Sequence, residues 1–287
     1  MLKKVIVTAI TILTLVYSAK IIVENYSLEN SSNTHDVTFF DYNNDGFLDL
    51  YVANGGFIAE QAVNLLYRNN GDGTFTNVTA ISGVGNKGWA MSAIVGDYNN
   101  DGYMDIYVAN WNSSKLGMPN VLYRNNGDGT FTEISKEVGL RHLGNGHGVI
   151  FGDYDNDGDL DIYLVNGGRD IGQPNALYRN YGNRNNWLKV KLMGRISNRW
   201  GIGAKVKAFI DQSLQIAEVG SGSGFGGQNS LIVHFGLGTF KKVNRKTKSS
   251  VSEANRLEVN WTSGIQQTLR NISANQILVI QELMSKN

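Results

Sequence analysis

The sequence predicts an all-β protein: three propeller-blade-like, four-stranded repeats, forming an open or partial propeller, precede a C-terminal β-sandwich-like domain. The first observation behind this fold class is an acidic loop that occurs three times, beginning at Asp41, Asp97 and Asp153, with a constant spacing of 56 residues. Constant spacing on this scale is typical of repeat architectures. The second observation is that segments with strand-like alternation of side chains flank every loop.

Each repeat carries a second shared segment. Residues 66–76 (LYRNNGDGTFT) recur unchanged at 122–132, and the third repeat begins the same segment at Leu177 but departs from it after Asn180. The Asn-Gly-Asp-Gly core predicts a hairpin turn between two short strands. One unit is then strand, acidic loop, strand, connection, strand, hairpin turn and strand, which is the composition of a propeller blade.

Apolar side chains alternate on both sides of each loop. Those expected on one face of the blades are Val37, Phe39, Leu50, Val52, Ala93, Val95, Ile106, Val108, Val149, Phe151, Ile162 and Leu164. The intervening Tyr51, Tyr107 and Tyr163 are expected on the opposite face, where they pack between blades.

The acidic loops have the donor pattern of a calcium site. Calcium takes six to eight oxygen ligands, and side chains at positions 1, 3, 5 and 9 with the carbonyl at position 7 supply them, while Gly at position 6 permits the sharp turn. The predicted ligands are Asp41, Asn43, Asp45, Phe47 (carbonyl) and Asp49; Asp97, Asn99, Asp101, Tyr103 (carbonyl) and Asp105; and Asp153, Asp155, Asp157, Asp159 (carbonyl) and Asp161. We therefore expect up to three calcium ions.

Two other interpretations fit the loops less well. An EF-hand requires a bidentate Glu at position 12, where this chain has Val52, Val108 and Leu164. Clusters of Asp, Asn and Gly also form tight turns without any ion, but three copies in register favour a metal. Magnesium is the weaker candidate because it retains several waters.

Composition limits the function classes. The chain has 287 residues, 41% of them hydrophobic, with a net charge of +1 and no cysteine. The small net charge gives no general attraction to nucleic acid. The absence of cysteine excludes disulfides and thiol catalysis.

The N-terminus predicts export. Lys3 and Lys4 precede an apolar run from Val5 to Ala19, which is short for a membrane span and suits a signal-peptide core. Residues 1–19 are thus expected to be a signal peptide or an uncleaved N-terminal anchor. The expected location is secreted, periplasmic or at the cell surface.

The loop pattern D-x-[DN]-x-D-G-x-x-D followed by D-[IL]-Y-[VL]-x-N resembles FG-GAP/VCBS-type repeats, the calcium-binding blades of integrin-like β-propellers. The resemblance covers the three repeats assigned to residues 20–183. It implies that the acidic loops bind calcium at blade turns.

The remaining residues, 184–287, have no acidic loop. Four motifs in order, at 198–204 (NRWGIGA), 220–227 (GSGSGFGG), 234–238 (HFGLG) and 261–264 (WTSG), resemble the ASPIC/UnbV domain of the cartilage acidic protein-like family. This resemblance implies a secreted or surface protein and supplies no established chemistry.

Propellers usually need at least four blades to close, and this chain has three. We expect an open arc packed against the C-terminal domain, with self-association left open.

We expect an exported calcium-binding protein, not an enzyme, that serves as a binding or adhesion scaffold for an extracellular protein or glycan. No nucleic-acid partner is expected, and membrane contact only through an uncleaved N-terminal segment. The alternatives are a carbohydrate-active enzyme, a lyase or hydrolase, and a non-enzymatic fragment of a larger surface adhesin.

Overall fold

This computed structural model describes residues 33–55, 63–111, 118–167, 172–220, 225, 227–239 and 253–284. In these ranges the chain is almost entirely β-structure, with one short helix, α2 (Thr79–Ser82). The predicted all-β class is confirmed. No helix in the described ranges has the length and apolar character needed to cross a membrane. The predicted signal or anchor segment at 1–19 lies outside the described residues.

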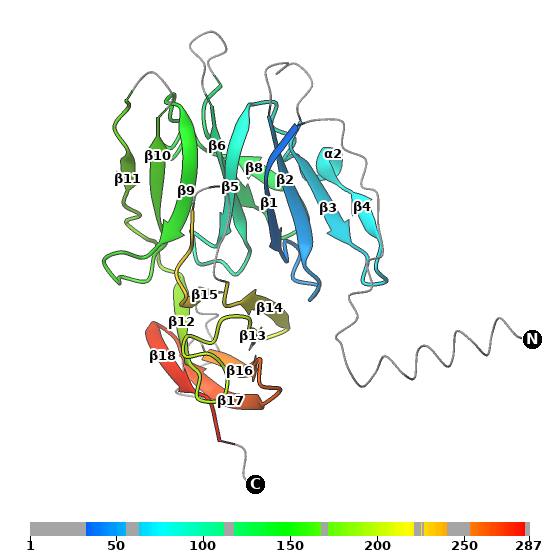
Figure 1. The fold of residues 1–287 in the computed structure, drawn as a ribbon, viewed down its shortest axis with the longest axis vertical. Helices are drawn as coiled ribbons and strands as arrows, with labels where there is room; N and C mark the ends of the chain where they lie inside the picture. Colours follow the sequence, from blue (N-terminus) through cyan, green and yellow to red (C-terminus); the bar gives the residue numbers. More distant parts are fainter. Residues whose placement is uncertain are drawn as a thin grey trace, which may run out of the picture. The chain divides into compact units, whose positions relative to one another are not determined.

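The first two repeats each form an antiparallel sheet of four strands in chain order (Figure 1). The first sheet contains β1 (Asn33–Phe40), β2 (Asp49–Gly55), β3 (Leu65–Asn69) and β4 (Phe75–Asn77). The second contains β5 (Ala90–Gly96), β6 (Asp105–Asn110), β7 (Val121–Asn125) and β8 (Phe131–Glu133). In both, the acidic loop joins the first two strands, and the predicted Asn-Gly-Asp-Gly hairpin joins the last two.

The third repeat forms a sheet of three described strands: β9 (Gly146–Gly152), β10 (Asp161–Asn166) and β11 (Ala176–Tyr178). The four-strand expectation is therefore corrected for this repeat. The chain lacks the hairpin turn after Asn180. Instead, the side-chain amides of Asn183 and Asn185 donate to the carbonyl of Asn99, at 2.5 and 2.8 Å. This segment runs along the second acidic loop instead of returning as a strand.

The tyrosines that follow the first two acidic loops lie between neighbouring sheets, as predicted, but the prediction is wrong for the third, Tyr163. Tyr51 packs with residues of the second sheet, and Tyr107 with residues of the third, and both are fully buried. Tyr163 is 39% exposed because, among the described residues, no fourth sheet packs on it.

The apolar face of β1 differs from its equivalents. Val37 and Phe39 are 49% and 58% exposed, whereas Val149 and Phe151 on β9 are buried against the second sheet. No preceding described sheet covers β1. The three sheets therefore form an open array, in agreement with the predicted partial propeller.

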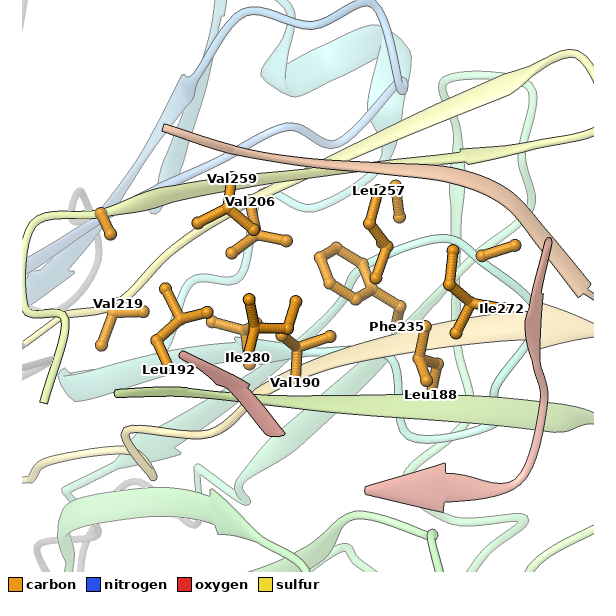
Figure 2. Packing of buried hydrophobic residues seen from close by; sticks show 14 of the residues in the cluster. Leu188, Val190, Leu192, Val206, Val219, Phe235, Leu257, Val259, Ile272 and Ile280 are labelled. Carbon is orange, nitrogen blue, oxygen red and sulfur yellow. The ribbon is translucent and has the colours of Figure 1, made fainter. Parts of the chain in front are cut away.

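The C-terminal part contains two sheets around one core (Figure 2). One has the order β15-β12-β18 and the other β14-β13-β16-β17. The strands are β12 (Asn186–Met193), β13 (Lys205–Ile210), β14 (Ser213–Glu218), β15 (Val233–Gly238), β16 (Glu253–Asn260), β17 (Gln266–Ser273) and β18 (Gln276–Gln281). Alternate residues of β12, namely Leu188, Val190 and Leu192, point into this core. The other face of β12 is therefore free to meet the repeats.

Candidate metal centre in the acidic loops

The three acidic loops share one backbone conformation. Asn44, Asn100 and Asn156, at position 4, have φ angles of 57°, 57° and 60°, and the glycines at position 6 have φ angles of 90°, 94° and 94°. Glycine adopts left-handed backbone without steric cost, and asparagine tolerates it better than most residues. These two positions let the chain curl around the carboxylate at position 1.

The carboxylate at position 1 is held by backbone donors of its own loop. Asp41 accepts hydrogen bonds from the N–H groups of Asp45 (3.1 Å) and Gly46 (2.8 Å). Asp97 accepts the equivalent pair at 3.0 and 2.7 Å. Both carboxylates are buried.

The carboxylate at position 9 links each loop to the third strand of its sheet or, in the third repeat, to Asn180 just after β11. Asp49 accepts the N–H of Tyr42 at 3.1 Å and that of Asn69 at 2.8 Å. Asp105 and Asp161 accept the same two bonds in their repeats. The sequence pattern predicted these residues as ligands but not this structural role.

Asparagine at position 3 contacts the aspartate at position 5. The amides of Asn43 and Asn99 donate to Asp45 and Asp101, each at 2.8 Å. In the first two loops, the predicted ligands at positions 3 and 5 thus contact each other through a hydrogen bond. The carbonyls of Phe47, Tyr103 and Asp159 stay predicted ligands.

Burial dominates the electrostatics of the carboxylates in the first two loops. Burial raises the pKa of Asp41 to about 6 and that of Asp49 to about 7, although backbone N–H donors oppose the rise. Burial, and then repulsion between carboxylates, also raises the pKa of Asp97 and of Asp105. Ionised carboxylates in such a site destabilise the fold unless a cation neutralises them. The oxygen-only donor set fits calcium.

The third loop contains the clearest group of ligand atoms. Asp153, Asp155 and Asp161 each offer one oxygen, and these oxygens lie within 4.8 Å of one another. The Oδ1 atom of Asp153 is buried and has no hydrogen-bond partner. An unpaired buried carboxylate oxygen is costly. A cation held by these three residues would satisfy it.

Two predicted residues of the third loop lie outside this group. Asp157 is 3.4 Å from the guanidinium of Arg179, and the side chain of Asp159 accepts a hydrogen bond from Asn100 at 2.9 Å. Burial, with repulsion from neighbouring carboxylates, raises the pKa of Asp159 to about 6.

Two basic residues that the loop pattern does not predict contact the third loop. Arg179 lies 2.7 Å from Asp155, and Lys189 on β12 lies 2.7 Å from Asp153. Arg179 belongs to the repeated Leu-Tyr-Arg-Asn segment, so the repeat pattern offered a signal for it. Lys189 had no local signal, because it comes from a different domain.

The sheet β15-β12-β18 presents one face to the acidic loops. His234 contacts Asn100, and the N–H of Gly238 donates to the carbonyl of Asn100 at 2.9 Å. A Cβ atom on Gly236 would collide with Asp97. The motif that resembles ASPIC/UnbV at 234–238 therefore fits against the second acidic loop.

Together, the fold and the loops define a β-repeat protein with aspartate-rich turns joined to a β-sandwich-like domain. Comparison with known families makes the class specific. An FG-GAP-like repeat model matches residues 56–108 and 108–164, and an ASPIC and UnbV model matches residues 194–287. The chain carries FG-GAP-like repeats followed by an ASPIC and UnbV domain, which confirms the resemblance stated from its motifs. The matched residues include the second and third acidic loops, and the first acidic loop lies before the matched region.

Curated relatives match most of the chain at low identity. The chain is 27% identical to cartilage acidic protein 1 of Homo sapiens, and the match covers 78% of this chain and 41% of the relative. It is 26% identical to cartilage acidic protein 1 of Mus musculus, and that match covers 78% of this chain and 42% of the relative. The match thus spans about two fifths of the length of these relatives.

Proposed function

We propose that this chain is an exported calcium-binding repeat protein that works by binding an extracellular protein or glycan. Calcium orders the acidic loops and holds the blades in the geometry that presents the binding surface. The chemistry is non-catalytic, because the loop carboxylates are engaged with their own backbone and with the cation.

The observation that carries this proposal is the arrangement of the third loop. Three carboxylate oxygens converge within 4.8 Å, and one oxygen of Asp153 is buried without a partner. Carboxylate oxygens are the hard donors that calcium prefers, and carbonyl or water oxygens would complete its six to eight ligands. The raised pKa values of Asp41 and Asp49 indicate the same need in the first loop.

Export is supported by the paired lysines and the apolar run at 1–19. The relatives are named for cartilage, a tissue made largely of extracellular matrix. N-terminal sequencing of the mature chain, isolated from the cell that produces it, tests this part. A chain that keeps Met1 and stays in the cytoplasm would contradict export.

Calcium binding is tested by isothermal titration of the purified chain, with thermal unfolding followed in calcium and in chelator. We expect up to three ions per chain and a melting temperature that falls in chelator. Affinities of about 10⁻⁴–10⁻³ M are usual for extracellular calcium modules, so the titration must extend into that range. Magnesium at the same concentration is the control and should stabilise less. No heat of binding and no shift in melting would overturn the proposal.

A further inference from the structure

Lys189 is a buried charged residue in a strand whose neighbours are apolar. It is 5% exposed, while Leu188 and Val190 on either side of it point into the core of the C-terminal domain. Lysine is almost never fully buried unless it is paired. Because side chains alternate along a strand, Lys189 points out of that core and toward the repeats.

The ammonium of Lys189 lies on the first carboxylate of the third acidic loop. Its Nζ atom is 2.7 Å from Oδ2 of Asp153 and 3.4 Å from Oδ1 of Asn156. The side chains of Lys189 and Asp153 are 6% and 1% exposed. Trp187, two residues earlier on the same face of β12, packs so closely on Gly158 that a Cβ there would collide with its ring. The face of β12 is therefore fitted to the third loop.

The first two loops organise the same carboxylate differently. In Asp41 and Asp97 both oxygens accept backbone N–H groups. In Asp153, Oδ2 accepts the N–H of Gly158 and the ammonium of Lys189, while Oδ1 has no partner. Within the described residues, only the third of the three loops thus has a lysine ammonium bound to one oxygen of its position 1 carboxylate. The other oxygen of the same carboxylate has no hydrogen-bond partner.

We propose that Lys189 is a positioning residue that acts as a built-in counter-cation of the third loop. It holds β12 on this loop in the absence of calcium, and it lowers the affinity of the loop for calcium. This inference rests on the proposed function, that the loops bind calcium. The physical reason is that calcium on Oδ1 and the ammonium on Oδ2 share one carboxylate and repel each other at close range in a buried site. The four carboxylates at the predicted side-chain ligand positions of this loop therefore do not make it the calcium site of highest affinity.

The test compares Lys189→Met with Lys191→Met in the full chain. Methionine keeps most of the apolar length and removes the charge, and Lys191 lies two residues along the same strand and is less buried. Calcium titration is run on both variants and on the unchanged chain, with Asp155→Asn identifying which binding event belongs to the third loop. Lys189→Met should bind calcium at this loop about tenfold more tightly, because one repulsive charge has been removed. Lys191→Met should leave that affinity unchanged.

Thermal unfolding in chelator gives a second readout. Lys189→Met should melt at a lower temperature than Lys191→Met in chelator, since Asp153 is left buried without a counter-charge. Calcium should remove most of that difference.

Three outcomes would overturn the inference. One is a third-loop affinity in Lys189→Met that is unchanged or weaker. Another is a higher calcium affinity at the third loop than at the other two loops. This comparison needs only the unchanged chain, so it decides the question even if the Lys189→Met variant does not fold. The last is an absence of calcium binding in every form, which overturns the proposed function and this inference with it. Calcium binding that is indifferent to Lys189 overturns the inference only.

Discussion

The Nε2 atom of His234 lies 2.6 Å from Oδ1 of Asn100, which joins the C-terminal domain to the second acidic loop. The amide nitrogen of Asn100 donates to the carbonyl of Gly158 and to Asp159 in the third loop, at 3.1 and 2.9 Å. Oδ1 must therefore accept, so His234 carries its proton on Nε2. Burial lowers the pKa of His234 to about 4, which keeps the ring neutral at physiological pH. One asparagine thus connects two acidic loops and a second domain.

Replacing Asn100 should destabilise the protein more than replacing its counterpart in the first loop. Asn44 has the same left-handed φ, and its side chain donates one hydrogen bond, to the carbonyl of Gly102 at 2.9 Å. Glycine keeps the backbone conformation in both cases. We expect Asn100→Gly to cost about 3 kcal/mol and Asn44→Gly about 1 kcal/mol, at roughly 1 kcal/mol for each hydrogen bond lost. Urea unfolding in saturating calcium measures both, and equal losses would contradict the central role of Asn100.

Gly236 should not tolerate a methyl group. A Cβ atom there would collide with the Asp97 carboxylate and the Asn100 backbone. Gly152, at the end of β9, has open space around the same position. We expect Gly236→Ala to destabilise by about 2–3 kcal/mol through overpacking, and Gly152→Ala to change stability by less than about 0.5 kcal/mol. Thermal unfolding of the two variants measures the difference in stability. If Gly236→Ala is as stable as Gly152→Ala, the contact between Gly236 and the second acidic loop does not contribute to stability.

Stability without calcium should fall as pH rises. The pKa values of Asp41 and Asp49 are raised from 3.8 to about 6 and about 7, chiefly by burial. Between the pKa of the unfolded state, 3.8, and the raised pKa of the folded state, the folded chain binds more protons than the unfolded chain. Stability is therefore lost as pH rises from about 4 to about 7. In chelator we expect a lower melting temperature at pH 8 than at pH 5. The rise in melting temperature on adding calcium should be larger at pH 8 than at pH 5, because calcium binds the ionised carboxylates. A rise that does not depend on pH would contradict this account.

Glu282 should stabilise the C-terminal domain. Its buried carboxylate accepts the N–H groups of Arg195, Ile196 and Ser197 at 2.7, 2.8 and 2.7 Å, and the hydroxyls of Ser197 and Ser263. We expect Glu282→Ala to cost about 3 kcal/mol, since several donors lose a charged acceptor. Glu258→Ala, which removes a half-exposed partner of Arg256, is the control and should cost less than about 1 kcal/mol.

The same residue should give acid sensitivity. Burial opposes ionisation of Glu282, but the hydrogen bonds from Ser263 and its other donors outweigh it and lower the pKa from 4.5 to about 2. A depressed pKa contributes stability that is complete above about 4.5 and is lost as pH falls toward 2. Unfolding free energies measured between pH 5 and pH 3 should fall more steeply in the unchanged chain than in Glu282→Gln. Parallel curves would exclude Glu282 as the cause.

Local features of the repeats could be predicted from the sequence because each depends on neighbouring residues. The strands flanking Asp41 and Asp97 follow the alternation of their side chains. The hairpins follow from Asn-Gly-Asp-Gly, and the sharp turn at position 6 of each loop from its glycine. The burial of Tyr51 and Tyr107 followed from their parity in the strand. Where the local signal stopped, after Asn180, the expected fourth strand of the third sheet was wrong.

The sequence by itself determined the repeat period, the strand pattern and the set of acidic side chains, because these are short-range features repeated at a constant offset. Only the tertiary structure decided what those side chains meet. Asn100 and His234 lie 134 residues apart in the chain, and Asp153 and Lys189 lie 36 apart. No local pattern encodes such pairs, because they form only when the C-terminal sheet packs on loops whose shape is already fixed. That packing buries an ammonium beside one loop and not beside the other two, so three loops of similar sequence acquire different electrostatics.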